Sequence, residues 1–432
     1  MEEYQSFSLG SQGELTMGGV SLPALAEKYG TPLYVMDEEK IRHTCRAYQR
    51  AMKRNFGDAF HVSYASKALC VKGIYPILKE EGMCADVVSG GELYTALQAG
   101  FDPAKLHFHG NNKSWEEMAM AIKAGIGSFI ADSEEEIHTL NELGGQLGKT
   151  VQVALRVKPG VDAHTHEFIS TGDLDSKFGF GYENGRALKA ACLVSSLPHL
   201  ELCGIHCHIG SQVFLTEPYK LACRVMFQLL TEIGRETGTV PPGLNLGGGF
   251  GIAYGPEDKP LPVDEMIDAL GEAVREGCRK HNLPQPFMTI EPGRSIVGPA
   301  GVTLYRVGSV KHIENVRTYV AVDGGMPDNP RYALYGASYQ AVKATDPKGE
   351  RNLRAAIAGK CCESGDLVTK DALIQPVQAG DLLCVFATGA YNYSMASNYN
   401  RLPRPPIVMV RDGKDRLLVK RESYEQLVQN DM

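Results

Sequence analysis

The sequence predicts an α/β protein with a (β/α)8 barrel of the TIM type, followed by a smaller antiparallel β-barrel or sandwich domain. Two observations predict this fold. Short β-rich runs alternate with amphipathic helical stretches over much of the chain, a pattern typical of parallel strands joined by helices. Each candidate polar motif also follows a different β-rich run, which favours a closed barrel over its main rival, an open doubly wound sheet.

The predicted barrel has eight strands, each a short run rich in β-branched and aromatic residues. We expect them at His61–Ser66, Cys84–Val88, Leu106–His109, Ser128–Ala131, Val151–Val157, Gly204–Ile209, Gly243–Leu246 and Met288–Glu291. Amphipathic segments between them predict helices at Val71–Glu81, Glu92–Ala99, Trp115–Ala124 and Ser133–Leu143. A longer helix, Asp37–Phe56, precedes the first strand. Ser133 followed by Glu136 predicts a capping box.

The pattern changes near residue 301, where strand-like runs alternate with Gly, Pro and Asp. We expect strands at Gly301–Val310, Thr318–Asp323, Leu353–Ala358, Leu382–Ala387, Ile407–Val410 and Leu417–Lys420, and a surface loop at Ser338–Arg351. The first 36 residues contain the strand-like run Thr31–Val35 and are expected to pack with this domain. The predicted domains are therefore 1–36 with 301–432, and a barrel over 37–300.

Bulk composition is that of a folded soluble protein. The chain has 432 residues, 43% hydrophobic and 22% charged, and a net charge of −7 that argues against general affinity for nucleic acid or anionic membranes. It has no apolar leader and no long apolar run, so we expect a cytoplasmic protein. The 11 cysteines contain no C-x-x-C pair, and reduced thiols are expected.

Two sequence clusters contain metal-ligand residue types. Cys203, His206, Cys207 and His208 alternate between the two faces of a predicted strand, so they do not converge easily. His164, His166 and Glu167 form an incomplete ligand set. We predict no metal site at either place.

Lys67 ends the first predicted barrel strand. An amine at the rim of a barrel is suited to forming a Schiff base. Taken alone, the alternative of a lysine extending from a strand end into solvent is the better interpretation.

A glycine-rich loop, Gly247–Gly251, follows the seventh predicted strand. Consecutive glycines let backbone N–H groups approach a phosphate closely. Ile252 occupies the third glycine position of the dinucleotide fingerprint, and no P-loop Lys-Ser/Thr follows. The loop therefore indicates a phosphate without indicating NAD or ATP, and it has more glycine than a simple tight turn requires.

Two further strand ends carry candidate residues. Glu291 could pair with a pyridinium nitrogen and Arg294 could bind an anion, although an ion-paired surface turn is the common alternative. At the end of the sixth strand, His208 could stack on a flat cofactor, and Ser211 beyond it could donate to a phosphate. For His206, on the same strand, we favour a buried core histidine.

These motifs, taken with others in the chain, carry a resemblance over nearly the whole length. The motifs are YASKAL at Lys67, SGGEL at Ser89, HGNNKS at His109, HTHEFISTG at His164, SKFGF at Ser176, HCHIGSQ at His206, NLGGGFG at Asn245, EPGRSIVG at Glu291, CESGD at Cys362 and the run Tyr391–Asn400. The sequence resembles the fold-type III pyridoxal 5'-phosphate-dependent decarboxylases, in particular those that act on diaminopimelate. This resemblance implies release of carbon dioxide from meso-2,6-diaminopimelate to form L-lysine, the last step of lysine biosynthesis.

The resemblance also implies roles for individual residues. Lys67 would attach the cofactor, His208 lie on its ring, Glu291 contact its ring nitrogen and Cys362 protonate the substrate. The implied cofactor-binding residues are Lys67, Asp86, His208, Ser211, Gly247, Gly248, Gly249, Glu291, Pro292, Gly293, Arg294 and Tyr391. The implied substrate-binding residues are Arg294, Arg331, Tyr335, Glu363 and Tyr391. Cys362 and Glu363 would reach the barrel of a neighbouring subunit, so the resemblance implies a homodimer with shared active sites.

Residue chemistry bears on the substrate. A glutamate on the ring nitrogen makes a stronger electron sink than the arginine that racemases of this architecture use, which favours decarboxylation. Two arginines suit a substrate with a distal carboxylate, which ornithine lacks. The sequence departs from the family at Tyr332, where proline is expected, and at the adjacent pair Lys360 and Cys361. Alternatives are a decarboxylase for arginine, ornithine or a carboxylated polyamine, and a cofactor-binding protein with little turnover.

Overall fold

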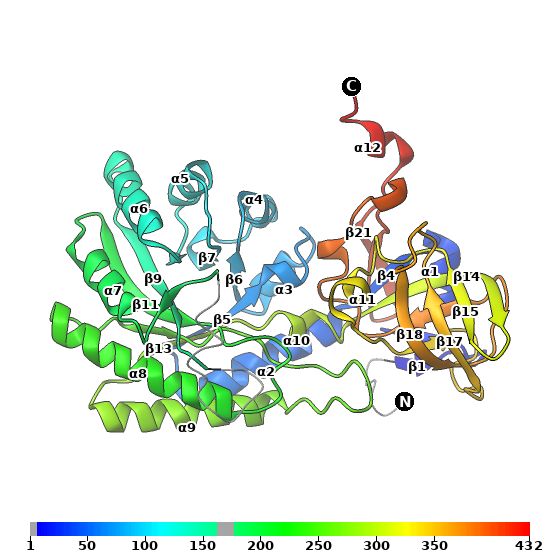
Figure 1. The fold of residues 1–432 in the computed structure, drawn as a ribbon, viewed down its shortest axis with the longest axis horizontal. Helices are drawn as coiled ribbons and strands as arrows, with labels where there is room; N and C mark the ends of the chain where they lie inside the picture. Colours follow the sequence, from blue (N-terminus) through cyan, green and yellow to red (C-terminus); the bar gives the residue numbers. More distant parts are fainter. Residues whose placement is uncertain (1–6, 162–176) are drawn as a thin grey trace. The chain divides into compact units, whose positions relative to one another are not determined.

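Eight parallel strands close into a ring in the computed structural model, which describes residues 7–161 and 177–432 (Figure 1). The chain divides into two compact units, which we call the barrel unit and the β unit. The barrel unit comprises Thr44–Gly251 and Pro260–Gly293. The β unit comprises Met1–His43, Ile252–Lys259 and Arg294–Met432.

The strand order of the barrel is β5-β6-β7-β8-β9-β11-β12-β13, and β13 pairs in parallel with β5 to close it. The bounds are β5 (Phe60–Ala65), β6 (Cys84–Val87), β7 (Leu106–Phe108), β8 (Ser128–Ala131), β9 (Val151–Lys158), β11 (Leu200–Cys207), β12 (Gly243–Asn245) and β13 (Phe287–Ile290). A two-residue strand, β10 (Phe180–Gly181), adds to β9. All eight predicted strands are confirmed, although β11 begins earlier than expected. β6 and β8 are buried at every position, as strands covered on both faces are.

Helices surround the barrel strands (Figure 1). Their bounds are α3 (Tyr75–Glu80), α4 (Gly90–Gln98), α5 (Trp115–Ala124), α6 (Glu134–Leu147), α7 (Arg186–Ser196), α8 (Glu217–Thr237) and α9 (Val263–His281), and α2 (Glu38–Phe56) precedes β5. Most of these helices bury one apolar face. Several end at a residue in the left-handed conformation, as α5 does at Gly125. Among the described residues, no helix has the length and apolar character needed to cross a bilayer.

Of the two hydrogen bonds of the capping box predicted at the start of α6, only one is present. The Ser133 hydroxyl accepts from the Glu136 N–H at 3.2 Å. The Glu136 carboxylate does not reach back to the cap, because it accepts from the Asp132 N–H at 3.0 Å and from the buried Lys113 ammonium at 2.7 Å. A buried ammonium needs an anionic partner, and that requirement outweighs the second capping bond.

The β unit is a mostly antiparallel sheet in the order β18-β17-β15-β14-β4-β20-β21, with β19 pairing both β14 and β16. Its strands are β4 (Leu33–Asp37), β14 (Gly301–Ile313), β15 (Arg317–Val322), β16 (Ala341–Lys343), β17 (Leu353–Ala358), β18 (Leu367–Ile374), β19 (Leu382–Val385), β20 (Ile407–Arg411) and β21 (Lys414–Val419). Smaller elements are β1 (Phe7–Leu9), β2 (Leu15–Met17), β3 (Val20–Ser21), α1 (Leu22–Tyr29), α10 (Arg294–Val297), α11 (Arg331–Tyr335) and α12 (Tyr424–Val428). β4, from the start of the chain, lies between β14 and β20.

The surface loop predicted at Ser338–Arg351 is wrong in its first half. Strand β16 lies there and pairs with β19, and Tyr339 and Val342 are almost fully buried. The strand is too short to show an alternating pattern, and its last residue, Lys343, is a charged residue typical of loops. In the structure Lys343 forms an ion pair with Asp381 at 2.8 Å, which allows it to lie in a strand. Strand β18 was also not predicted, since Thr369, Lys370 and Asp371 interrupt its apolar pattern.

Candidate active site at the carboxyl ends of the barrel strands

Lys67 lies in a single 3-10 turn, Ser66–Ala68, that directly follows β5. Its neighbours Ser66 and Ala68 are buried, whereas Lys67 itself is exposed at the rim. Its positive charge acts on the buried carboxyl group of Asp86 and on His208, so all three belong to one electrostatic cluster. The predicted amine is therefore solvent-accessible and close to two other predicted cofactor residues.

The Glu291 carboxylate, just after β13, is the centre of a buried polar cluster. It accepts from Asn245 Nδ2 at 2.6 Å, and its oxygens lie 3.1 Å from His206 Nε2 and 3.2 Å from His109 Nε2. Burial alone would raise the pKa of Glu291, but His206 and His109 hold this pKa well below its usual range. Glu291 is therefore an ionised carboxylate in a low-dielectric site.

Asp86, at the end of β6, has the opposite character. It is buried, and Ser63 donates a hydrogen bond to it. Burial and the neighbouring charge of Glu291 raise the pKa of Asp86 well above its usual range. Of these two buried carboxyl groups, Glu291 thus carries the negative charge.

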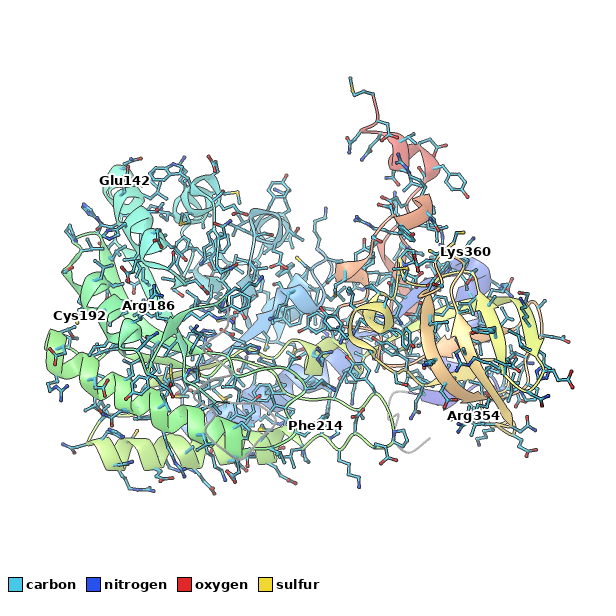
Figure 2. The ribbon with its side chains drawn as sticks, in the orientation of Figure 1. Glu142, Arg186, Cys192, Phe214, Arg354 and Lys360 are labelled. Atoms are coloured by element: carbon cyan, nitrogen blue, oxygen red, sulfur yellow. The ribbon has the colours of Figure 1, made fainter. Side chains whose placement is uncertain are left out.

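The glycine loop after β12 is packed too closely for any side chain. A Cβ on Gly248 would lie 2.1 Å from the carbonyl oxygen of Glu291, and one on Gly249 would lie 2.2 Å from that of Gly210. Gly249 also has a φ of +97°. At Gly251 a Cβ would come within 2.7 Å of the Phe214 ring, which is labelled in Figure 2. Only glycine fits these positions.

The loop after β11 lies against the glycine loop. The Val213 N–H donates to the Gly249 carbonyl at 2.9 Å, and the Gly251 N–H donates to the Val213 carbonyl at 3.1 Å. Ser211 lies two residues before Val213, and these two bonds tie its loop to the glycine loop.

His208 and His206 are both part of the barrel site. Burial, reinforced by the charges of Lys67 and Arg156, lowers the pKa of His208 to about 3, so the ring is neutral. Its Nδ1 lies 3.4 Å from the Gly248 nitrogen. His206, interpreted as a core histidine, is indeed buried, but it contacts Glu291 directly. The sequence does not predict this contact, because it joins a residue of β11 to one that directly follows β13, far apart in the chain.

In the β unit, two arginines lie against the ring of Tyr391. The guanidinium carbons of Arg294 and Arg331 are 4.6 Å and 5.4 Å from the ring centroid. Arg331 is also 5.2 Å from the ring of Tyr335. The four predicted substrate residues Arg294, Arg331, Tyr335 and Tyr391 are thus brought together in a cluster that would attract an anion.

Tyr254 is a member of this arginine cluster that the sequence did not predict. Its hydroxyl accepts from Arg294 Nη1 at 2.5 Å. The residue comes from the segment Ile252–Lys259, which belongs to the β unit although it follows the glycine loop in sequence. His109 and Asn245 were likewise not assigned, although the motifs HGNNKS and NLGGGFG begin with them.

Cys362 and Glu363 lie in an exposed turn between β17 and β18. The Cys362 N–H donates to Asn400 Oδ1 at 2.8 Å, and the Glu363 carboxylate accepts from the Gly365 N–H at 3.2 Å. For the adjacent Cys361, burial and Asp366 raise the thiol pKa to about 12. Cys362 is exposed whereas Cys361 is half-buried, so Cys362 is the more accessible of the two thiols. The cluster His164, His166 and Glu167 lies outside the described residues.

Gly248→Ala should lower the free energy of unfolding by about 1–3 kcal/mol, because the added methyl group collides with backbone rather than with a flexible side chain. Urea denaturation measures this loss. Gly255→Ala is the matched control, since a Cβ there meets nothing within 4 Å. Equal stabilities of the two variants would contradict the close packing of the glycine loop.

Comparison with known proteins identifies relatives over the whole chain. The family described as "Pyridoxal-dependent decarboxylase, pyridoxal binding domain" matches residues 38–298. The diaminopimelate decarboxylase of Bacillus subtilis is 49% identical over 420 residues, 97% of this chain and 95% of the relative. The diaminopimelate decarboxylase of Staphylococcus aureus is 47% identical over 97% of this chain and 98% of the relative.

Solved structures agree with the sequence matches. The diaminopimelate decarboxylase of M. jannaschii in complex with L-lysine superposes with a TM-score of 0.93 at 36% identity, covering 100% of this chain and 98% of the other. The Helicobacter pylori enzyme complexed with L-lysine superposes with a TM-score of 0.84 at 30% identity, covering 94% of this chain and 98% of the other. The predicted fold class, a TIM-type barrel with an antiparallel β domain, is confirmed.

Proposed function

The chain belongs to the diaminopimelate decarboxylase family of pyridoxal-dependent decarboxylases, and from this premise we propose that it converts meso-2,6-diaminopimelate to L-lysine and carbon dioxide. One observation supports the reaction type above the others. An ionised, buried Glu291, surrounded by His206, His109 and Asn245, is the partner that a protonated pyridine nitrogen requires.

The residues at the barrel rim fit pyridoxal 5'-phosphate. We propose that Lys67 supplies the attaching amine, that the neutral His208 lies on the ring, and that Asp86, Pro292 and Gly293 line its pocket. The backbone of Gly247, Gly248 and Gly249, together with Ser211, would bind the phosphate, because a main chain without side chains lets an anion approach closely. When bound, this cofactor supplies an electron sink for the pair left behind as carbon dioxide departs.

Chain residues supply the proton chemistry. The Glu291 carboxylate would hold a proton on the ring nitrogen of the bound cofactor, and its own low pKa keeps it charged through the neutral pH range. Cys362 delivers a proton to the α-carbon after carbon dioxide leaves. Its exposed position in the β17–β18 turn supports delivery into a partner's site. We therefore propose a homodimer in which Cys362 and Glu363 complete the active site of the other subunit.

Specificity follows from the two charged ends of the substrate. Arg294 and Arg331, with Tyr335 and Tyr391, would bind the distal carboxylate. Glu363 would bind the distal ammonium group. Ornithine and lysine carry no distal carboxylate and would leave the arginine pair without an anion.

A substrate panel tests the proposal directly. Carbon dioxide release is measured from meso-diaminopimelate, L-ornithine, L-arginine and L-lysine with added pyridoxal phosphate, and L-lysine is assayed as the product. We expect release from meso-diaminopimelate alone or far above the rest. Release only from ornithine or arginine would replace the proposed substrate while keeping the reaction type.

Arg331→Leu should lower kcat/KM for meso-diaminopimelate about 10- to 100-fold, because it removes a charge-assisted hydrogen bond to the distal carboxylate. Steady-state kinetics measures this change, and the cofactor absorbance should stay unaltered. Arg354→Leu is the matched control, an exposed arginine of β17 labelled in Figure 2. Equal kcat/KM values for both variants would remove Arg331 from the binding site.

A further inference from the structure

Three ligand-type side chains gather at the amino ends of neighbouring barrel strands. His61 is the second residue of β5, Cys84 the first of β6 and His107 the second of β7. One nitrogen of each histidine and the sulfur of Cys84 all lie within 4.8 Å of one another. The three residues are far apart in sequence, and no motif in the chain marks them.

Sheet register explains why they converge. Cys84 lies opposite Ser63 on β5, and His107 lies opposite Asp86 on β6. Because side chains alternate along a strand, His61 and Ser63 share one face, as do Cys84 and Asp86. Ser63 donates a hydrogen bond to Asp86, so the faces of β5 and β6 that carry His61 and Cys84 lie on the same side of the sheet.

His107 presents a nitrogen ready to bind. Its Nδ1 lies 2.8 Å from Ser128 Oγ, and its Nε2 is buried without a hydrogen-bond partner among the described residues. When Nδ1–H donates this hydrogen bond to Ser128 Oγ, Nε2 carries a lone pair. This arrangement, in which the second ring nitrogen is fixed by a hydrogen bond, is the usual one for metal-binding histidines. Burial lowers the pKa of His107 to about 4, so the ring is neutral.

The other two groups suit the same ion. Burial lowers the pKa of His61, which therefore offers a neutral ring, and its edge packs on Phe287 with centroids 4.7 Å apart. Cys84 is 2% exposed. Burial raises the pKa of its thiol to about 12. Lys105 acts in the opposite direction, whereas the charges of Asp86 and Asp102 raise this pKa further. Coordination must therefore displace the thiol proton.

We propose that His61, Cys84 and His107 form a binding site for a divalent ion of the Zn²⁺ class at the amino ends of β5, β6 and β7. Two imidazoles and one thiolate select borderline-soft ions over Mg²⁺ or Ca²⁺. Ligand atoms of a tetrahedral zinc site are roughly 3.3–3.6 Å apart, so small side-chain rotations close the site. Binding breaks the S–H bond of Cys84, the sulfur keeps the electron pair, and the proton passes to solvent.

The three ligands differ from the residues of the proposed catalytic site. Lys67 and Glu291 follow the carboxyl ends of their strands, whereas the three ligands lie near the amino ends, where residues of such barrels serve stability. A water molecule would complete the fourth position of a tetrahedral ion. A bound ion would tie three strands together and raise the thermal unfolding temperature.

Cobalt substitution tests the site on the chelator-treated protein loaded with pyridoxal phosphate. Tetrahedral Co²⁺ has visible ligand-field bands at longer wavelengths than the cofactor, and a blank of Co²⁺ with free cofactor is subtracted. We expect these bands at one ion per chain, with displacement by Zn²⁺. No bands, and no Zn²⁺ retained after equilibrium dialysis, would overturn the proposal.

Variants assign the ligands. Cys84→Ser should abolish the bands, and the half-buried His61→Gln, which disturbs the fold least, should weaken the affinity at least about 10-fold. Cys223→Ser is the matched control, since Cys223 is a buried cysteine of α8 whose thiol pKa is also raised to about 12. If the bands persist in both the Cys84→Ser and the His61→Gln protein, the ion binds elsewhere and the proposed site is refuted.

Discussion

Lys67→Ala should lose the visible absorbance of the bound cofactor and lower kcat by at least about 10³-fold, because no other amine occupies the rim position after β5 that the proposal requires. Absorbance spectra and carbon dioxide release measure the two effects. Borohydride reduction of the unaltered protein should leave a covalent adduct on the peptide that contains Lys67.

Lys72→Ala is the matched control for this variant. Lys72 is the next lysine along the chain and is exposed. Its removal should leave both absorbance and turnover unchanged. An adduct found on a different lysine, or a coloured and fully active Lys67→Ala protein, would reject Lys67 as the attachment site.

Cys362→Ala should keep the cofactor absorbance while turnover falls about 10²- to 10⁴-fold, the range expected when a positioned proton donor is lost. Cys361→Ala is the matched control and should keep most of the activity, since its thiol has a pKa of about 12 and releases a proton poorly. The reverse ranking of the two variants would assign proton delivery to Cys361.

Mixing the Lys67→Ala and Cys362→Ala subunits tests the shared site. If each site draws Lys67 from one subunit and Cys362 from the other, random re-pairing should restore about a quarter of the original activity in a two-fold dimer. Dimers shown to have exchanged subunits but lacking any recovery would place both residues of a site in one chain.

The barrel was predictable because every strand alternates with a helix and each β-rich run is bounded by turn residues. Strand ends such as those of β8 and β17 follow directly from the local pattern. The glycine loop, Glu291 and Arg294 were also recognisable, since their residue types are unusual for ordinary turns. The β16 strand was not, because three residues are too few to establish a period.

What the sequence could not reveal is the set of partners around each candidate residue. Glu291 receives His206 from β11 and His109 from the end of β7, and no local pattern links them. Tyr254 joins Arg294 across 40 positions in the chain. The contacts of Glu291 depend on the closure of the barrel, so His206, seen on its own strand, looks like part of the core.

The position of β4 between β14 and β20 has a consequence for biosynthesis. Leu33–Asp37 leaves the ribosome early, but its partner strands begin at Gly301 and Ile407. At about 5–20 residues per second, the first partner follows roughly 13–50 s later. During this interval an apolar strand has both edges unpaired. A product that terminates before residue 301 therefore lacks both partner strands of β4 and cannot complete the sheet.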